Sequence, residues 1–329
     1  MNRLITFFLF FTLIPFVFAH DNDPLPSWNE GENKHHIIQF VQSVSDPKSS
    51  DYVAPEDRIA TFDNDGTLWS EKPFYFQLYF VIDRIKMLAP QHPEWKTTQP
   101  FKAVLENDQE TLLKSGKEGL LKLVMATHTG MTDEEFDTIV IEWINSAQHP
   151  RFKRPFKELV YQPMLELLSY LRANQFKTFI VSGGGIDFMR PWASEVYGIP
   201  SEQIVGSSIV VKYQEGKIIR QPKLNFNDDK EGKPVAIHYH IGKRPIAAFG
   251  NSDGDLAMMQ YTDASKNKTF KMYIHHTDSK REWAYDRQSH VGALDKGLDY
   301  AQEHDWTIID MKNDWKVVFP FELNGKILK

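Results

Sequence analysis

Three short apolar segments, far apart in the sequence, each end in a polar or glycine-rich cluster. An apolar run of about five residues bounded by turn-forming residues is typical of a buried strand. In open α/β sheets, ligands bind at the carboxyl ends of the parallel strands, so three such clusters can meet in one pocket. The segments are 58–62, followed by Asp63-Asn64-Asp65-Gly66, 177–181, followed by Ser182-Gly183-Gly184-Gly185, and 245–249, followed by Gly250-Asn251-Ser252-Asp253-Gly254-Asp255.

The remaining apolar pattern predicts helices that alternate with strands. Residues 74–152 carry apolar side chains at helical spacing and are predicted to be mostly helical, without a strand. Strands that alternate with helices predict a parallel sheet with crossover helices. The predicted helices are 36–44, 78–87, 101–113, 119–125, 134–144, 164–173, 234–241 and 294–303, with a further strand at 271–275 and a β-hairpin over 204–213 and 216–220.

The first 19 residues have the pattern of a signal peptide. Arg3 precedes an uncharged apolar run over 4–18, and Val17 and Ala19 are small residues at the positions that a signal peptidase recognises. The alternative is a membrane anchor, but the run is interrupted by Pro15 and is shorter than the roughly 20 residues of a spanning helix. We therefore expect cleavage after Ala19, export to the periplasm or the medium, and no stable membrane anchor.

The charge balance and the lack of cysteine exclude several kinds of chemistry. The 329 residues include 38 Lys and Arg, 44 Asp and Glu, and no Cys, for a net charge of −6. Thiol catalysis, Cys-ligated zinc and iron–sulfur clusters are therefore impossible. The slight acidity argues against nucleic acid as a partner.

Asp63 and Asp65 are two residues apart at the predicted strand end, so both carboxyl groups can face one phosphate-sized space. One carboxylate can then attack phosphorus while the other protonates the leaving oxygen. Concentrated carboxylate oxygens also favour Mg²⁺ as the cofactor. The alternative is a plain turn, since all four residues of Asp-Asn-Asp-Gly favour turns.

The three clusters together resemble motifs of the haloacid dehalogenase-like (HAD) superfamily of hydrolases. Residues 63–68 resemble its first motif in the phosphatase form, 181–184 its second motif in the phosphoserine phosphatase branch, and 250–255 its fourth. With residues 68–73 and 311–320, the chain further resembles an exported bacterial group of these hydrolases. The resemblance implies a Rossmann-like α/β core over 20–73 and 153–329, with a helical cap inserted over 74–152.

The resemblance also implies a reaction. A small phosphorylated metabolite is hydrolysed as a phosphomonoester, with Mg²⁺ and an aspartyl-phosphate intermediate. A phosphotransferase of the same fold and a non-catalytic protein that binds phosphorylated ligands remain alternatives. Asp63 is the expected nucleophile, Asp65 the general acid and then base, and Ser182, with the N–H groups of Gly183 and Gly184, the phosphoryl-binding element.

A lysine is expected to neutralise the phosphoryl group. Lys233, at the start of the predicted helix 234–241, is the first candidate, Lys230 is a close rival and Lys223 is less favoured. The expected metal ligands are Asp63, Asp65, Asn251 and Asp255. Asn251 stands where the family generally has an aspartate, so Asp253 is an alternative ligand, and Asp255 either holds the metal through water or orients Lys233.

The cap is expected to close over the pocket and to contact the substrate. Thr67 and Glu71 are predicted substrate-binding residues, with Glu71 placed to bind an amine of the substrate. Adjacent residues of a strand point to opposite sides, so His275 and His276 are not expected to form a two-histidine metal site. Five aromatic residues near the cap entrance line either a leaving-group pocket or the core: Trp69, Phe74, Tyr75, Phe76 and Tyr79.

Overall fold

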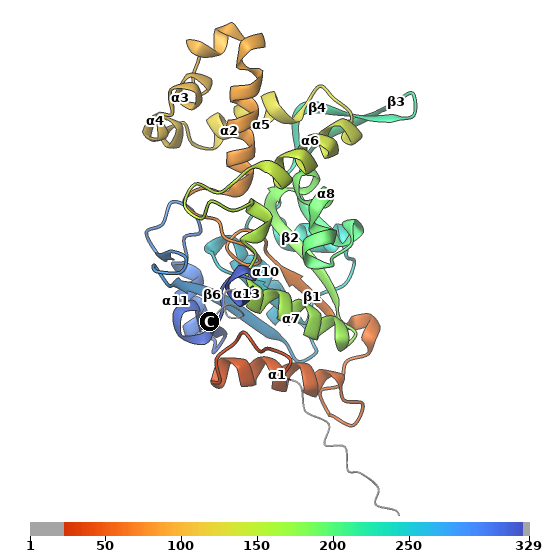
Figure 1. Cartoon of the computed structure of the whole chain (residues 1–329). Coiled ribbons are helices and arrows are strands. Elements are labelled where there is room, and N and C mark those ends of the chain that lie inside the picture. Colours follow the sequence, from red (N-terminus) through yellow and green to blue (C-terminus); the bar gives the residue numbers. More distant parts are fainter. Residues whose placement is uncertain (1–22, 325–329) are drawn as a thin grey trace, which may run out of the picture.

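The computed structural model describes residues 23–324 (Figure 1). The predicted signal peptide, residues 1–19, lies outside this range and stays a prediction. Among the described residues, no helix combines the length and the apolar character that a membrane-spanning segment requires.

A mainly parallel sheet lies at the centre of the molecule (Figure 1). Its strands are β1 (Ile59–Phe62), β2 (Lys177–Gly185), β3 (Ile204–Gln214), β4 (Lys217–Phe226), β5 (Ala247–Gly250), β6 (Phe270–Thr277), β7 (Ala284–Tyr285) and β8 (Thr307–Asp310). Their order is β4-β3-β2-β1-β5-β6-β7, and β8 also pairs with β6. The pairs from β3 to β6 and on to β8 are parallel, whereas β4 and β7 pair antiparallel. The predicted α/β fold class is therefore confirmed.

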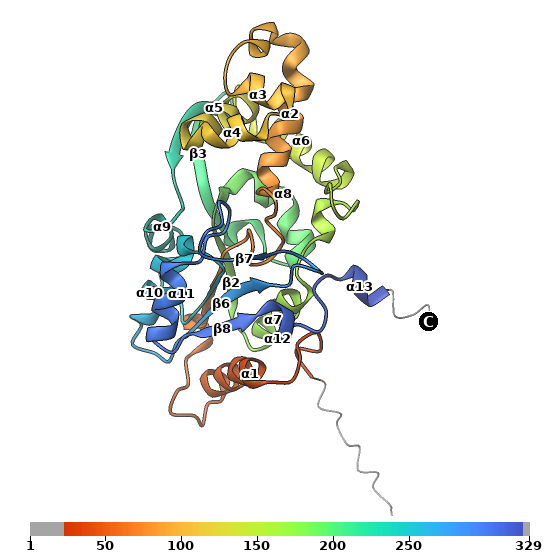
Figure 2. The ribbon, with the colours of Figure 1, turned by 90° about the vertical axis from the view of Figure 1, so that its left-hand side faces the viewer.

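Helices cover both faces of this sheet (Figure 2). They are α1 (Glu32–Ser45), α7 (Gln162–Ala173), α8 (Ile186–Tyr197), α9 (Gly232–His240), α10 (Leu256–Asp263), α11 (Lys296–Glu303), α12 (Met311–Asp314) and α13 (Phe321–Asn324). Successive strand residues face opposite sides, so Ile180 joins the apolar cluster that includes side chains of α1, α7 and α8, and Val181 joins the cluster that includes side chains of α9, α10 and α11. The strand ends are thus held rigidly between two apolar layers.

A second group of helices, which we call the cap helices, stands above the carboxyl ends of the strands (Figure 1). The cap helices are α2 (Phe76–Leu88), α3 (Phe101–Glu106), α4 (Gln109–Lys114), α5 (Gly116–His128) and α6 (Asp133–Ser146). Helices α2 to α5 share an apolar core that includes Val81 and Leu123, whereas the buried side chains of α6, such as Phe136, belong to the main core of the molecule. The single helix predicted over 101–113 is wrong, because Asn107 adopts a left-handed conformation and Asp108 then caps a new helix at the N–H of Thr111.

The hairpin β3–β4 connects the sheet with the cap helices. The prediction of a hairpin is confirmed, and its second strand is longer than expected, ending at Phe226 rather than 220. Arg220 of β4 is buried, and its side-chain Nε donates to the carbonyl of His128 at 2.6 Å. Its main-chain N–H donates to the carbonyl of Met131 at 3.0 Å. The layer above the site therefore includes this hairpin, while the cap boundaries at 74 and 152 stay a prediction.

Candidate active site

The register of the central strands brings the three polar clusters together. Phe62 of β1 pairs with Ile180 of β2 and with Phe249 of β5. The main-chain N–H of Asp63 also donates to the carbonyl of Phe249 at 2.9 Å. The residues that follow these strands therefore lie side by side beneath the cap helices.

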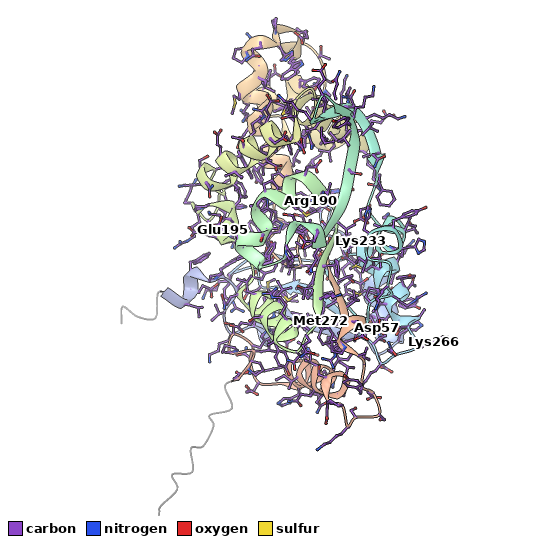
Figure 3. All side chains as sticks on the ribbon, turned by 90° about the vertical axis from the view of Figure 1, so that its right-hand side faces the viewer. Asp57, Arg190, Glu195, Lys233, Lys266 and Met272 are labelled. Carbon is purple, nitrogen blue, oxygen red and sulfur yellow. The ribbon has the colours of Figure 1, made fainter. Side chains whose placement is uncertain are left out.

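Lys233 joins two of these clusters through its ammonium group. Its Nζ donates to Asp63 Oδ1 at 2.7 Å, to Asp255 Oδ1 at 2.6 Å and to the carbonyl of Val181 at 2.8 Å. The side chain is buried in the interior, between the sheet and the cap helices (Figure 3). Lys230 and Lys223 are both exposed, so the geometry favours Lys233 over its rivals.

Burial and charge together set the protonation of this group. Burial raises the pKa of Asp63, Asp255 raises it further, and Lys233 opposes both effects. Burial by itself lowers the pKa of Lys233, but Asp255 and Asp63 raise it well above its usual value. Lys233 is therefore a permanent positive charge beside the predicted nucleophile.

Asp65 lies in the turn after β1, where it is only partly buried. Its Oδ1 accepts a hydrogen bond of 2.7 Å from the indole N–H of Trp69. Burial raises the pKa of Asp65 to about 6, although the bond from Trp69 and the charge of Lys233 lower it. A carboxyl group with such a pKa can donate and accept a proton near neutral pH.

Residues 182–185 form the carboxyl end of β2, where the register with β3 shifts, and end directly before α8; we call them the glycine loop. Ser182 is buried, and its Oγ accepts the N–H of Gly184 at 3.1 Å. The N–H of Gly185 donates to the side-chain oxygen of Gln77 in α2, at 2.8 Å. Gln77 was not predicted, since its partner lies 108 residues away and no local pattern marks such a contact.

The acidic residues of the third cluster have partners of their own. Asp253 accepts main-chain N–H groups of Asp295 and Gly297 at 2.9 and 2.8 Å, so its carboxylate caps the start of α11. Asp255 binds Lys233 with one oxygen and the N–H groups of Asn251 and Ser252 with the other, both at 3.0 Å. The structure therefore disfavours Asp253 as a metal ligand and favours the orienting role for Asp255.

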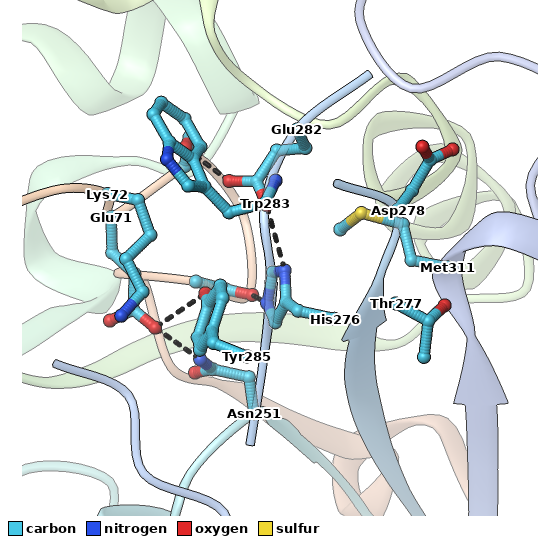
Figure 4. Close-up of polar contacts among 12 residues, drawn as sticks. Glu71, Lys72, Asn251, His276, Thr277, Asp278, Glu282, Trp283, Tyr285 and Met311 are labelled. Atoms are coloured by element: carbon cyan, nitrogen blue, oxygen red, sulfur yellow. Dashed lines mark hydrogen bonds and ion pairs between the residues drawn. The ribbon is translucent and has the colours of Figure 1, made fainter. Parts of the chain in front are cut away.

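Asn251 is buried and contacts both predicted substrate-binding side chains. Its Nδ2 donates to Glu71 Oε1 at 2.7 Å, and its Oδ1 accepts from Thr67 Oγ1 at 3.2 Å. Glu71 also accepts a hydrogen bond of 2.8 Å from the hydroxyl of Tyr285 (Figure 4). Burial raises the pKa of Glu71 to about 7, and His276 and Tyr285 oppose the shift. In this structure Thr67 and Glu71 face Asn251, and their predicted contact with the substrate stays a prediction.

His276 contacts the turn after β1 and lies beside Tyr285 (Figure 4). Its Nε2 lies 2.8 Å from the carbonyl of Gly66, and its Nδ1 lies 3.2 Å from Glu282 Oε2. Glu282 is buried and also accepts hydrogen bonds from Ser70 and Tyr161. His275 and His276 differ in exposure, as expected for neighbours on a strand, and they do not converge on one site.

The oxygen atoms at the strand ends suit Mg²⁺. Within residues 23–324, no group of three or more His, Cys, Asp or Glu side chains is arranged to hold a metal ion. The predicted ligand set of Asp63, Asp65 and Asn251 would instead combine carboxyl oxygens with one amide oxygen, which here accepts a hydrogen bond from Thr67, and it stays a prediction. Such hard oxygen ligands are those that Mg²⁺ prefers.

Comparisons with known proteins agree with this architecture. The family model of the haloacid dehalogenase-like hydrolases matches residues 60–260. A search of curated proteins gives no match. A functionally unknown protein from Anaerococcus prevotii is similar in structure, with 18% identity, a TM-score of 0.53, and coverage of 88% of this chain and 94% of that one.

Two further structures are similar at lower scores. A protein of unknown function from Bordetella pertussis has 15% identity and a TM-score of 0.49, covering 77% of this chain and 98% of that one. A phosphoserine phosphohydrolase-like protein from Francisella tularensis has 14% identity and a TM-score of 0.40, covering 83% and 100%. At such identities, the similarity to the Anaerococcus protein concerns the fold alone.

Proposed function

Because this chain belongs to the haloacid dehalogenase-like hydrolase family, we propose that it is a Mg²⁺-dependent phosphomonoester hydrolase. Its substrate is a small phosphorylated metabolite, and Asp63 carries the phosphoryl group as an aspartyl-phosphate. The observation that supports this most strongly is the ammonium group of Lys233, held between Asp63 and Asp255 at 2.7 and 2.6 Å. A buried cation beside a nucleophilic carboxylate stabilises the charge that develops when the phosphoryl group is transferred.

The proposed reaction has two steps. In the first, the oxygen of Asp63 that does not bind Lys233 attacks phosphorus, the bond to the leaving oxygen breaks, and Asp65 gives that oxygen its proton. The hydroxyl of Ser182 and the main-chain N–H of Gly183 hold the phosphoryl oxygens, and the N–H of Gly184, which donates to Ser182 Oγ, keeps that hydroxyl in place. In the second, Asp65 takes a proton from a water that attacks phosphorus, and the products are inorganic phosphate and free Asp63.

Mg²⁺ fits beside these groups. Asp63, Asp65 and Asn251 would hold it, and when bound it neutralises charge on the phosphoryl oxygens. The exchange of the usual aspartate for Asn251 lowers the charge of the ligand set but keeps an oxygen at the position.

Phosphate release tests the proposal. The purified full chain with Mg²⁺ is expected to release phosphate from members of a panel that includes phosphoserine, phosphocholine, sugar phosphates and nucleotides. Asp63→Asn is expected to abolish release, and Asp57→Asn, an exposed aspartate paired with Lys243, is the matched control. Binding of phosphoesters without hydrolysis across the panel would contradict the proposal and favour a binding protein, whereas transfer to an added alcohol would favour the phosphotransferase.

We also propose that the chain is exported and cleaved after Ala19, on the strength of its apolar N-terminal pattern alone. Mass spectrometry of the exported protein is expected to find an N-terminus at His20. A mature chain that still begins at Met1 would contradict this.

A further inference from the structure

We propose that Glu71 is a positioning residue that fixes the orientation of the Asn251 amide and thereby makes an asparagine usable as a metal ligand. The proposal rests on the Mg²⁺ site of the proposed function. It gives Glu71 a task different from contact with the substrate.

The amide of Asn251 is held from both sides. Its nitrogen donates to the Glu71 carboxylate at 2.7 Å, and its oxygen accepts from the Thr67 hydroxyl at 3.2 Å. All three side chains are buried, so water does not replace these contacts. An ionised carboxylate only accepts hydrogen bonds, so a rotated amide would place two oxygens in contact. Glu71 therefore selects one orientation of Asn251.

Glu71 is itself fixed in place (Figure 4). The hydroxyl of Tyr285 donates to the same Oε1 at 2.8 Å, and the Tyr285 ring stacks on His276 with centroids 4.4 Å apart. Two glycines with positive φ leave room for the carboxylate, since a Cβ on Gly66 would lie 2.5 Å from Oε1 and one on Gly292 would lie 1.8 Å from it. The backbone thus forms a cradle around the carboxyl group of Glu71.

This arrangement has a chemical reason. An aspartate presents an oxygen whichever way it turns, but an asparagine presents an oxygen on one arm and an N–H₂ group on the other. A hard cation binds only the oxygen. Asn251 therefore needs a fixed acceptor for its nitrogen, and Glu71 supplies that acceptor. Glu71 also places a negative charge behind the Asn251 side chain, on the far side from the proposed metal position.

An exchange of the two functional groups tests the pairing. Binding of Mn²⁺, a spectroscopic substitute for Mg²⁺, is measured by electron paramagnetic resonance at pH 8 on the full chain. Glu71→Gln is expected to weaken binding about tenfold, as loss of a residue that orients a metal ligand commonly does. Asn251→Asp is expected to weaken it as well, because two carboxylates then touch.

The double variant Asn251→Asp/Glu71→Gln decides the question. Its Gln side chain can donate to the new carboxylate, so Mn²⁺ affinity is expected to recover at least tenfold over Asn251→Asp alone. Glu71→Gln then weakens binding in one background and strengthens it in the other, a change of sign that a purely structural role does not produce. Additive losses, or unchanged binding in Glu71→Gln, would overturn the proposal.

Two controls keep this result separate from folding and from catalysis. Glu56→Gln, on the surface, is expected to leave Mn²⁺ affinity unchanged, and Tyr285→Phe, which removes one hydroxyl from Glu71, is expected to weaken it a few-fold. If the carboxylate variants unfold, an unchanged affinity in Tyr285→Phe overturns the proposal. If the variants show the expected pattern of Mn²⁺ binding but the wild type releases no phosphate, the proposed hydrolase function is overturned and the role of Glu71 stands. If the wild-type chain binds no Mn²⁺, the role of Glu71 is overturned.

Discussion

The sheet side and the cap side of the active site differ in charge. The sheet supplies ionisable groups that pair with one another, with Lys233 between Asp63 and Asp255. Gln77 and His128 of the cap helices are neutral, because Gln77 is an amide and because burial, with the charges of Arg220 and Arg84, lowers the pKa of His128 to about 3. In the proposed reaction, the charged groups that serve any phosphoester therefore belong to the sheet, and Gln77 contacts the glycine loop as a neutral group.

The neutral groups of the cap form a directed chain of hydrogen bonds. The Thr127 hydroxyl donates to the carbonyl of Leu123 at 2.9 Å, so it accepts from Nδ1–H of His128 at 2.8 Å. The other ring nitrogen, Nε2, then accepts from the amide nitrogen of Gln77 at 3.1 Å. The Gln77 oxygen therefore points toward Gly185 and accepts its N–H, so the amide of Gln77 links the cap helices to the glycine loop.

If the stability and activity of the sheet side depend on the balance of its buried charges, Lys233→Met is expected to have the largest effect on both. The change leaves Asp63 and Asp255 buried without their cation, which costs about 3–5 kcal/mol of unfolding free energy. We expect no measurable phosphate release, with stability read from urea unfolding. Lys243→Met, which breaks an exposed pair with Asp57, is the control and costs less than about 1 kcal/mol. Equal losses in the two variants would contradict the charge argument.

Asp65→Asn has the next largest effect, on rate and on pH dependence. The raised pKa of Asp65, about 6, keeps part of the carboxyl protonated near neutral pH, so kcat/KM is expected to fall as pH rises through that value. The variant should lose this limb and about 10²–10⁴-fold in kcat for alkyl phosphates. The loss should be smaller for 4-nitrophenyl phosphate, whose leaving group needs no acid. An identical pH profile in the variant contradicts the role of Asp65.

On the cap side, Gln77→Ala is expected to have a moderate effect. The change removes one neutral hydrogen bond to Gly185 and leaves the charged groups in place. We expect kcat/KM to fall about tenfold and the unfolding free energy to change by about 1 kcal/mol. Gln91→Ala, an exposed glutamine in the same region, is the matched control. A loss as large as that of Lys233→Met would erase the distinction between the two sides.

Asp228→Asn is expected to have the smallest effect on activity and to act on stability alone. Asp228 is fully buried, and no hydrogen bond of good geometry reaches either carboxylate oxygen among the described residues. Burial raises its pKa to about 7, so the folded protein binds the proton more tightly than the unfolded chain does. This tighter proton binding stabilises the folded state fully below about pH 4, and the stabilisation is lost as pH rises through about 7.

The asparagine does not titrate, so this pH dependence should vanish in Asp228→Asn. We expect the variant to be more stable than the wild type by about 2 kcal/mol at pH 8, with the advantage shrinking toward pH 5. Urea unfolding at both pH values measures this. A variant that is less stable at pH 8 would show that Asp228 has a partner after all.

The sequence could predict those parts of the site that depend on neighbouring residues. A buried strand followed by turn-forming acids is a local pattern, and it located Asp63 and Asp65 at the end of β1. Lys233 and Lys230 are only three residues apart, so spacing could not separate them. Lys233 lies inside α9, whereas Lys230 has a φ of 55° before the helix and points to solvent.

Contacts between segments that lie far apart in the chain produce no local sequence pattern, so they could not be predicted. No residue near Glu71 in the sequence marks the contact of its carboxylate with Tyr285, 214 residues away. Strand β8 was not predicted, and only its pairing with β6 identifies it as part of the sheet. Both features depend on tertiary packing, which a periodic pattern within one segment does not encode.

The hairpin β3–β4 has a consequence for protein engineering. Because Arg220 bonds the chain at His128 and Met131, the layer over the site is assembled from two insertions that leave the sheet at different points. A chimera that takes only the cap helices of a relative would keep a hairpin shaped for the original ones. Specificity is therefore expected to transfer between relatives only when residues 76–146 and the outer part of the hairpin, residues 209–225, are exchanged as a pair.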